Sequence, residues 1–405
     1  MRQKFLKLIL FCLLLITAIS PPGAAAGAKY TGQYKAIWFS YFDYQLYLDK
    51  YKENNAANFR CFFAEVVANC KSRGFNHLIV HVRPCADAIY KSDYFPTSVY
   101  IAGRQGAALT YDPLKIMVEE THKQGLAIEA WINPYRITNR KIPSSELSEE
   151  NIASRWQKSD NPFLRRNVLN YKGRLYLNPA KKMVRQLIID GVREIVKNYD
   201  IDGIHLDDYF YPKFSEDDYD TAFDAPEYHH SREKAEGIGI ADFRRRQVNF
   251  LVTGLRSAVK DIKPDITFGI SPSGIIDHLT DEYQYYVDIE KWCSSDQYVD
   301  YILPQLYWGF RHRCLKYDME LVRWQKITDQ SKVKLYIGLP AYKMLSKKGT
   351  TPAEDKEFHS RDTLKKMIAF ARSKNADGVA VFDYRDIINP AKQECIDAMT
   401  EELTK

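Results

Sequence analysis

The segment most informative about the fold is Ile201-Asp202-Gly203-Ile204-His205-Leu206-Asp207-Asp208-Tyr209-Phe210-Tyr211-Pro212. Here a short apolar strand runs directly into two adjacent carboxylates and then a cluster of aromatic rings. Carboxylates at a strand tip can serve as a general acid and as a stabiliser of charge. The same order of apolar strand, polar tip and aromatic rings recurs along the chain, which favours a barrel whose strand ends carry a site.

Eight short segments are predicted to be strands, because most are near-continuous apolar runs of the kind that parallel sheets bury on both faces. They are Lys35–Phe39, His77–Val82, Ala127–Trp131, Gly203–Leu206, Thr267–Ile270, Tyr301–Gln305, Leu335–Leu339 and Gly378–Phe382. Helical patterns lie between many of them, at Asn58–Ser72, Pro113–Lys123 (capped by Asp112), Lys181–Asn198, Phe243–Lys260, Asp362–Ser373 and Ala391–Leu403. This alternation predicts an α/β fold, a TIM (β/α)8 barrel, as a single domain over residues 30–405.

Two connections in this barrel are unusually long. Ile137–Tyr176 follows the third strand, and Phe210–Ile240 follows the fourth. Both would rise from the C-terminal face, where barrel active sites lie, so we expect them to wall a substrate groove. For the second connection the alternative is a disordered surface excursion.

The N-terminus has the pattern of a secretory signal peptide over residues 1–26. A basic region with Arg2, Lys4 and Lys7 precedes the apolar run Leu8–Ile19, and small residues near Ala26 suit cleavage. No other long apolar stretch follows. We therefore expect an exported protein, periplasmic or secreted, without stable membrane insertion after cleavage.

Composition excludes some classes of function. The formal net charge of +6 is spread along 405 residues with no Lys/Arg tract, so a nucleic-acid groove is not expected. No metal-binding spacing and no nucleotide loop is present, and we predict neither a metal nor a cofactor. After signal cleavage six cysteines remain, which we predict to be buried free thiols, although export permits disulfides. The sequence leaves the oligomeric state open.

The candidate carboxylates gather around the fourth strand. Alternation along it places His205 and Asp207 on one face, which would be the barrel interior, and Asp208 follows at the tip. Two close carboxylates push their pKa values apart, so that one can stay protonated as an acid. The alternative for Asp208 is a cap on the following loop. His205 is more readily a buried support than a proton donor, whereas Glu129 and Asp383 could each be a support or a second carboxylate.

Six blocks of sequence resemble the bacterial glycosyl hydrolase-like family 10, in order and with similar spacing over residues 32–385. They are His81-Val82-Arg83-Pro84, Tyr111-Asp112-Pro113-Leu114, Ala130-Trp131-Ile132-Asn133-Pro134-Tyr135-Arg136, residues 202–211, Gly269-Ile270-Ser271-Pro272-Ser273-Gly274 and Pro304-Gln305-Leu306-Tyr307-Trp308. The family includes an envelope enzyme that cleaves denuded peptidoglycan, meaning glycan strands stripped of their stem peptides. The resemblance implies a TIM barrel and a glycoside hydrolase whose partner is a glycan.

A more distant likeness bears on mechanism. Residues 202–207 resemble the fourth-strand motif of family 18 chitinases, but His205 replaces an Asp and Tyr209 stands where the acid Glu would be. An adjacent Asp pair also resembles the family 84 N-acetylglucosaminidases, which implies Asp207 as orienter of the substrate acetamide and Asp208 as acid/base. Substrate-assisted hydrolysis of this kind needs no protein nucleophile.

The polar and aromatic residues at the strand tips are the candidate substrate contacts, because barrel enzymes draw their functional groups from these ends. They are Arg83, Trp131, Asn133, Tyr135, Arg136, Tyr209, Gln305, Tyr307, Trp308 and Asp383. The alternative for several is structural, since Pro at strand ends shapes turns and Arg–Asp pairs tie loops together. Two rival functions stay open: a glycosidase on another polysaccharide with Asp207 as nucleophile, and a non-catalytic glycan-binding barrel.

Overall fold

The computed structural model describes residues 32–139, 146–329, 331–347 and 349–405. Residues 31–405 form one compact unit. The predicted signal peptide, residues 1–26, lies outside the described residues.

Eight parallel strands close into a barrel, which confirms the predicted fold. Their order around the barrel is β1-β10-β9-β8-β7-β6-β3-β2, with β2 pairing back to β1. The strands are β1 (Tyr34–Phe39), β2 (His77–Arg83), β3 (Ala127–Ile132), β6 (Gly203–Leu206), β7 (Thr267–Ile270), β8 (Tyr301–Ile302), β9 (Lys334–Pro340) and β10 (Gly378–Phe382). All but β8 agree with the predicted strands to within one residue at each end.

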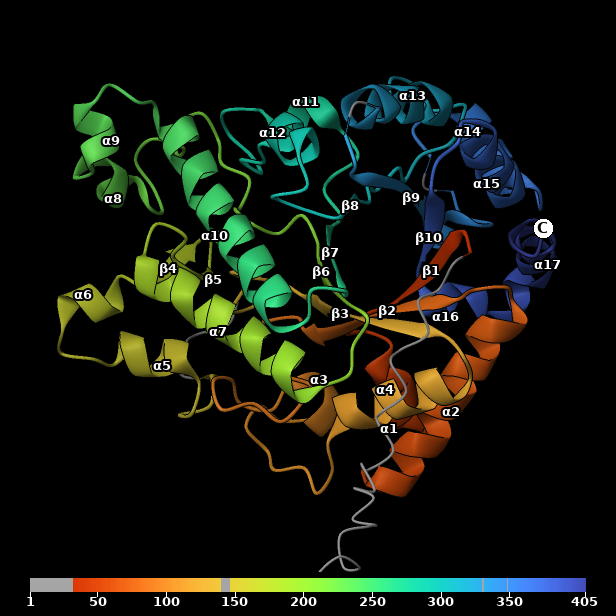
Figure 1. The fold of residues 1–405 in the computed structure, drawn as a ribbon, viewed down its shortest axis with the longest axis horizontal. Coiled ribbons are helices and arrows are strands. Elements are labelled where there is room, and N and C mark those ends of the chain that lie inside the picture. The colour runs from red at the N-terminus through yellow and green to blue at the C-terminus, as the bar shows by residue number, and fades with distance from the viewer. Residues whose placement is uncertain (1–31, 140–145, 330, 348) are drawn as a thin grey trace, which may run out of the picture. The chain divides into compact units, whose positions relative to one another are not determined.

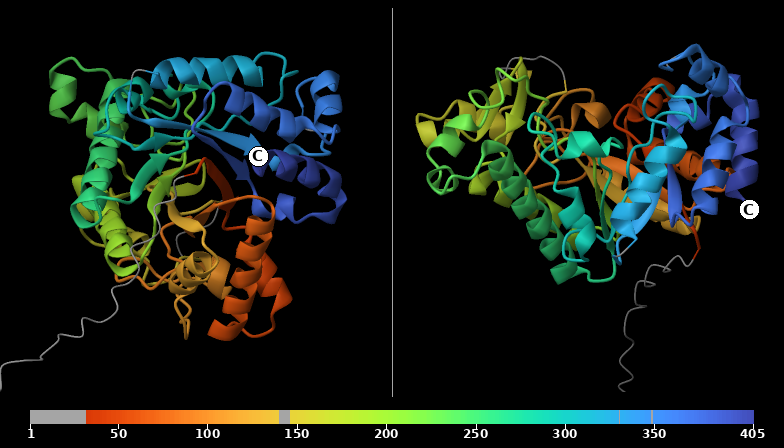
Figure 2. Two further views of the ribbon diagram at one scale, coloured as in Figure 1. Left: turned by 45° about the vertical axis from the view of Figure 1, so that its right-hand side comes forward. Right: turned by 90° about the horizontal axis from the view of Figure 1, so that it is seen from above.

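The principal helices follow the strands and surround the barrel, as Figures 1 and 2 show. They are α2 (Ala56–Ser72), α4 (Pro113–Lys123), α7 (Lys182–Asn198), α10 (Ile240–Ile262), α13 (Tyr317–Thr328), α15 (Thr363–Ser373) and α17 (Gln393–Leu403). Shorter helices lie in the connections: α1 (Tyr44–Lys50), α3 (Val99–Ala102), α5 (Ile152–Gln157), α6 (Pro162–Arg165), α8 (Ala225–His229), α9 (Arg232–Ala235), α11 (Ile276–Leu279), α12 (Ile289–Ser294), α14 (Pro352–Phe358) and α16 (Tyr384–Ile387), with 3-10 turns at Ala341–Lys343 and Pro390–Lys392. The Asp112 side chain accepts from the Lys115 N–H and caps α4, as the sequence predicted.

Strand β8 is shorter than predicted, because its ladder ends at Ile302 rather than Gln305. Pro304 follows and has no N–H to offer a neighbouring strand. The segment nevertheless stays in place, since the Leu303 N–H donates to the Ile270 carbonyl and the Gln305 N–H to the Pro272 carbonyl.

The barrel interior is filled by large aromatic side chains opposite glycines. A Cβ added at Gly269 would lie 2.0 Å from the Tyr301 ring, and one at Gly203 would lie 3.0 Å from Glu129 Cγ. These glycines therefore leave room for Tyr301 and Glu129 inside the barrel. The outward faces of the strands pack against the helices in a separate, larger core.

The two long connections lie on the same side of the barrel in Figure 1. The described part of the first holds α5, α6 and an antiparallel hairpin of β4 (Val168–Tyr171) and β5 (Arg174–Leu177). The second holds α8 and α9 and is ordered, contrary to the alternative of a disordered excursion. The connections are bonded to each other, because the Tyr171 hydroxyl donates to Asp218 Oδ2 at 2.8 Å.

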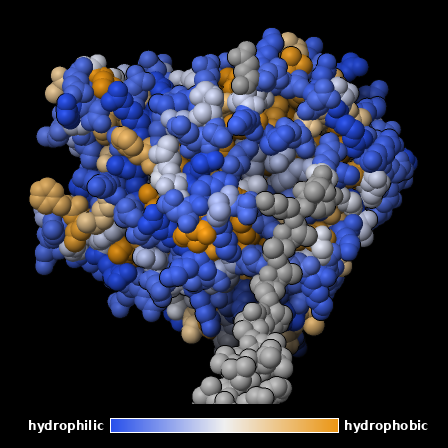
Figure 3. Space-filling view, in the orientation of Figure 1, coloured by the Kyte–Doolittle hydropathy of each residue, from blue (hydrophilic) through white to orange (hydrophobic). Residues whose placement is uncertain are grey.

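The surface in Figure 3 is largely hydrophilic, with apolar side chains in scattered spots. Among the described residues, no helix is both long and apolar enough to cross a membrane. The six cysteines among the described residues are free thiols, as predicted, but Cys61 and Cys314 are exposed, which corrects the prediction that all six are buried. Cys61 lies on the outer face of α2, and Cys314 lies in the loop before α13.

Candidate active site

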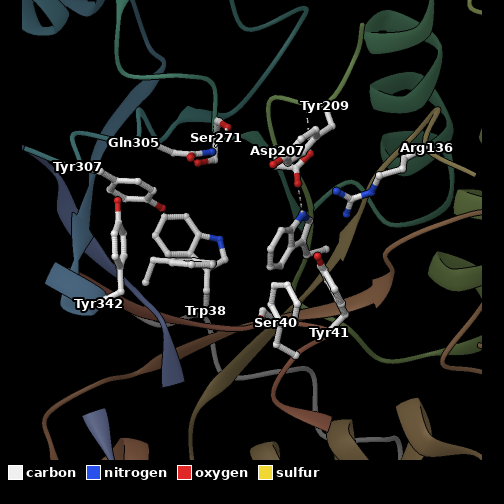
Figure 4. A pocket seen from close by; sticks show the side chains of 13 residues that line it. Trp38, Ser40, Tyr41, Arg136, Asp207, Tyr209, Ser271, Gln305, Tyr307 and Tyr342 are labelled. Atoms are coloured by element: carbon white, nitrogen blue, oxygen red, sulfur yellow. Dashed lines mark hydrogen bonds between the residues drawn. The ribbon is translucent and has the colours of Figure 1, made fainter. Parts of the chain in front are cut away.

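A recess of about 250 Å³ opens at the carboxyl ends of the strands (Figure 4). In that view Trp38, Tyr307 and Tyr342 line one side, and Asp207, Arg136, Tyr209 and Tyr41 line the other. Its full lining is Trp38, Ser40, Tyr41, Phe42, Trp131, Arg136, Asp207, Tyr209, Ser271, Gln305, Tyr307, Tyr342 and Phe382. Six of the predicted site residues are thus brought together here: Trp131, Arg136, Asp207, Tyr209, Gln305 and Tyr307.

Asp207 is held rigidly inside this recess. Its side chain is 4% exposed, and it accepts from Trp131 Nε1 at 3.2 Å and from the Tyr209 N–H at 3.2 Å. Burial, followed by repulsion from Asp208, raises the pKa of Asp207 to about 8, although Arg136 and the two donors act in the opposite direction. Asp207 can therefore hold a proton at neutral pH.

Asp208 is half-buried and lies at the edge of the site. Burial raises its pKa to about 6, and the Arg136 charge and a hydrogen bond from Gln305 limit that rise. Asp208 lines a second recess that adjoins the first. The two carboxylates therefore face different recesses. The fourth-strand tip thus carries two carboxyl groups with pKa values that are pushed apart.

The donor to Asp207 is itself fixed by packing. The Trp131 ring stacks on His81, with centroids 3.6 Å apart and an interplanar angle of 11°. His81 is fully buried, and burial lowers its pKa well below the usual value, so that it is a neutral ring. The stack aims the indole N–H at Asp207 Oδ2.

Beneath this layer a chain of hydrogen bonds crosses the barrel. Trp38 Nε1 donates to His205 Nε2 at 3.2 Å, and His205 Nδ1 lies 2.8 Å from the Tyr301 hydroxyl. Since Trp Nε1 is only a donor, the His205 proton is on Nδ1. Burial lowers the pKa of His205 to about 3, so it is neutral. These contacts are those of a buried residue that supports its neighbours, which is the role that the sequence suggested for His205.

Glu129 ends this chain at the floor of the barrel. It accepts from the Tyr34 hydroxyl at 2.9 Å and from the Tyr301 hydroxyl. Burial raises the pKa of Glu129 to about 7 against the lowering effect of these two donors. Glu129 does not line the recess, and its position is that of an inward-facing support.

Five predicted substrate contacts lie outside the recess lining: Arg83, Asn133, Tyr135, Trp308 and Asp383. Arg83 is 1% exposed, with Nη2 donating to the Pro134 carbonyl at 3.3 Å and its guanidinium 4.8 Å from the Phe95 ring centroid. Asn133 and Tyr135 are fully buried, and Trp308 packs in the core at 8% exposure. The structure does not bring these side chains to the recess, and their contact with substrate stays a prediction.

Asp383 lies directly after Phe382, which lines the recess, but is itself outside the lining. It is 8% exposed, and burial together with the charges of Asp43 and Asp386 raises its pKa to about 8. Asp43 belongs to the same carboxylate group, with Oδ2 accepting from the Ser40 hydroxyl at 2.8 Å. Asp383 is thus next to the lining residue Phe382 in the chain, and the Asp43 carboxylate, whose charge acts on Asp383, accepts from the lining residue Ser40.

Several lining residues were not among the predicted contacts. They are Trp38, Ser40, Tyr41, Phe42, Ser271, Tyr342 and Phe382. Each lies at the carboxyl end of a barrel strand or just after it, so the rule that strand ends line the site could have identified them.

A second recess of about 500 Å³ adjoins the first across Tyr209. It is lined by Tyr171, Lys172, Arg174, Tyr176, Asp208, Tyr209, Tyr211, Pro212, Lys213, Gln284 and Tyr285. Most of these residues come from the two long connections, which therefore do wall a groove. No cluster of His, Cys, Asp or Glu suited to a metal ion occurs within the described ranges.

Comparison with known proteins agrees with this geometry. The model of the family Glycosyl hydrolase-like 10 matches residues 34–353. The chain is 33% identical over 327 residues to glycosyl hydrolase YngK of Bacillus subtilis, covering 76% of this chain and 61% of that one. It is 30% identical over 287 residues to glycosyl hydrolase DigH of Escherichia coli K12, covering 67% and 63%. The chain spans about three fifths of the length of these relatives.

Solved structures share the fold. The glycoside hydrolase domain of PgaB from Bordetella bronchiseptica matches with a TM-score of 0.56 and 12% identity, over 91% of this chain and 99% of that one. The catalytic domain of a β-amylase from Paenibacillus polymyxa also gives 0.56, at 10% identity over 92% and 97%. The family match extends from β1 into α14 and shows that the chain belongs to glycosyl hydrolase-like family 10.

Proposed function

We propose that this protein is an exported glycoside hydrolase that cleaves the glycan strands of peptidoglycan, in their peptide-free form, or a related N-acetylhexosamine polymer. The observation that carries the proposal is the Asp207–Asp208 pair, with Asp207 in the aromatic recess, Asp208 in the adjoining one, and pKa values raised to about 8 and about 6. Between these values the pair holds one proton. One carboxylic acid and one carboxylate is the combination that glycoside cleavage requires.

Substrate binding directs that proton. An acetamide N–H that donates to Asp207 stabilises its ionised form, because a hydrogen bond to the charged form lowers the pKa. The proton then resides on Asp208, at the border of the two recesses, where the bond between two sugars would lie. Asp208 protonates the glycosidic oxygen while the acetamide oxygen attacks the anomeric carbon, and Asp208 next takes a proton from the water that opens the resulting ring.

The recess walls suit an N-acetylated sugar. The rings of Trp38 and Tyr307 line the recess, and Tyr342 lies edge-on to Tyr307 with centroids 5.8 Å apart. Flat apolar faces match the C–H face of a pyranose. Gln305 donates to the Ser271 carbonyl at 3.1 Å and also supports Asp208, which leaves its amide positioned beside the substrate.

Two further features support an envelope substrate. Residues 1–26 have the pattern of a secretory leader. The sequence blocks around the site resemble a family that includes an enzyme of denuded peptidoglycan.

The test is digestion of purified glycan strands, with and without stem peptides, by the wild type, Asp207→Asn and Asp208→Asn, with products identified by mass spectrometry. Asp296→Asn, an exposed carboxylate outside both recesses, is the matched control. We expect cleavage of bare strands by the wild type and the control, and loss of cleavage in both site variants. No cleavage of either substrate by the wild type would refute the peptidoglycan proposal.

A further inference from the structure

The second recess differs chemically from the first. Three cationic side chains, Lys172, Arg174 and Lys213, line it, and Asp208 is its one carboxylate. Among the residues that the structure describes, neither Arg174 nor Lys213 forms an ion pair with a carboxylate. Lys172 does, because its Nζ lies 3.1 Å from Asp218 Oδ2. Two cations thus remain uncompensated beside the catalytic pair.

The cations are carried by an anchored framework. In the hairpin register Tyr171 pairs with Arg174, and the tight turn consists of Lys172 and Gly173, both with positive φ. The hairpin is tied to the catalytic recess by a β-bridge between Tyr176 and Arg136. The Tyr171–Asp218 hydrogen bond fixes its other side. The backbone of Arg174 therefore has a defined position relative to the catalytic pair, and its exposed side chain extends from that point.

The remaining lining is aromatic. Tyr171, Tyr176, Tyr209, Tyr211 and Tyr285 surround the cations. Burial raises the pKa of Tyr285, and the charge of the nearby Asp208 raises it further. A recess that combines tyrosine rings with unpaired cations suits a sugar that carries an anionic substituent.

From this geometry we infer that the second recess is a subsite for a sugar bearing a carboxylate, with Arg174 and Lys213 as its ligands. Resting on the proposed function, the inference assigns that carboxylate to the lactyl group of the muramic acid residue next to the cleaved bond. In peptide-bearing strands this carboxyl is consumed in the amide bond to the stem peptide and is uncharged. The subsite therefore selects peptide-free strands by charge.

The first measurement is binding, which does not depend on cleavage. Titration calorimetry on the inactive Asp207→Asn/Asp208→Asn protein compares two forms of one strand fragment: lactyl carboxylates free, and the same carboxylates converted to methyl amides. Arg174→Gln and Lys213→Gln, added to this inactive protein, should weaken binding of the free carboxylate form about tenfold, as expected for loss of two exposed ionic hydrogen bonds. The affinity for the methyl amide form should stay unchanged. The matched control is Arg193→Gln/Lys197→Gln, which removes two exposed cations of α7 that form no ion pair among the described residues.

The second measurement is kinetic and uses the active protein. Arg174→Gln/Lys213→Gln should raise KM for the free form about tenfold with little change in kcat, and Arg174→Lys/Lys213→Arg should restore most of the loss. The preference for the free form should also weaken as salt concentration rises.

Three outcomes would overturn the subsite: equal binding of both forms by the inactive parent, equal weakening of both by the neutralising pair, or no binding of either form. Charge-selective binding without any cleavage by the wild type would instead refute the proposed activity and leave the carboxylate subsite standing.

Discussion

Glu129 at the floor of the barrel makes stability depend on pH in a way that can be measured. Its two oxygens accept from the hydroxyls of Tyr34 and Tyr301, and Tyr301 continues the chain to His205. Glu129→Gln keeps the shape but replaces one acceptor with a donor. One tyrosine O–H then has no oxygen of residue 129 to donate to, and leaving a buried O–H without an acceptor costs about 1–3 kcal/mol.

The pH dependence follows from the raised pKa. Glutamate has a usual pKa near 4.5, and in the fold burial raises the pKa of Glu129 to about 7. A raised pKa means that the folded protein binds the proton more tightly than the unfolded chain does. This contribution to the free energy of unfolding is present at low pH and is lost as pH rises from about 4.5 to about 7, and between pH 5 and pH 8 it amounts to about 2–3 kcal/mol.

The glutamine variant cannot titrate at this position. The difference in free energy of unfolding between wild type and Glu129→Gln should therefore shrink by about 2–3 kcal/mol from pH 5 to pH 8. Urea denaturation at both pH values measures it, and contributions from other titrating groups cancel in the difference. Glu149→Gln, whose side chain is 95% exposed, is the control and should show no change. The same difference at both pH values would refute the reasoning, since Glu129 would then not titrate between them.

Three further changes test other parts of the structure. Trp131→Phe removes the N–H donor to Asp207 but keeps a ring over His81. We expect kcat/KM on bare strands to fall about five- to tenfold. The alkaline limb of the pH profile of kcat/KM should move to higher pH, because the pKa of Asp207 rises without that donor. Trp292→Phe, which removes a buried N–H bond to Asn249 elsewhere, should leave the profile in place, and an unmoved limb in Trp131→Phe would contradict the assignment. Arg244→Met leaves the buried Asp224 without its guanidinium partner at 2.8 Å and should lower the free energy of unfolding by about 3–5 kcal/mol; Asp224→Asn in the same chain should recover part of that loss, and full stability of the single variant in urea would count against the pair. Gly269→Ala puts a methyl group 2.0 Å from the Tyr301 ring and should lower the thermal midpoint, at a cost of about 3 kcal/mol, whereas Gly239→Ala, with open space around it, should not.

The barrel could be predicted from sequence because its signals are local. Near-continuous apolar runs such as Leu78–Val80 and the Asp112 cap on α4 depend on neighbouring residues only. The floor of the site was also accessible, since alternation along the fourth strand placed His205 and Asp207 on one face. Trp308 could not be assigned in the same way. Its strand β8 ends at Ile302, and beyond Pro304 the period of two no longer says which way a side chain points.

The limits of sequence reasoning are clearest at Arg83 and Arg136, two arginines that follow neighbouring strands. Arg136 lines the recess because its Nε donates to the Pro84 carbonyl at 2.9 Å and its guanidinium lies 4.6 Å from the Tyr209 ring centroid. Arg83 turns instead toward Phe95 and the Pro134 carbonyl. Both orientations depend on backbone carbonyls and rings from other segments. Local pattern therefore identifies the residue types at the strand ends, whereas tertiary contacts decide which of them face the substrate.

The hairpin β4–β5 is an intermediate case. Tyr171-Lys172-Gly173-Arg174 lies between alternating apolar residues, which is a recognisable signal for a tight turn, and Lys172 and Gly173 adopt the positive φ values that such a turn requires. The hairpin could thus be predicted from sequence as an element, but its position beside the site could not. That place depends on the bridge from Tyr176 to Arg136 and on the hydrogen bond from the Leu177 N–H to the Tyr135 carbonyl, both across about 40 residues of chain. These contacts bring Arg174 to the edge of the site, so in this barrel the chemistry at the centre comes from strand tips, and the charge that surrounds it comes from a connection whose position only the fold defines.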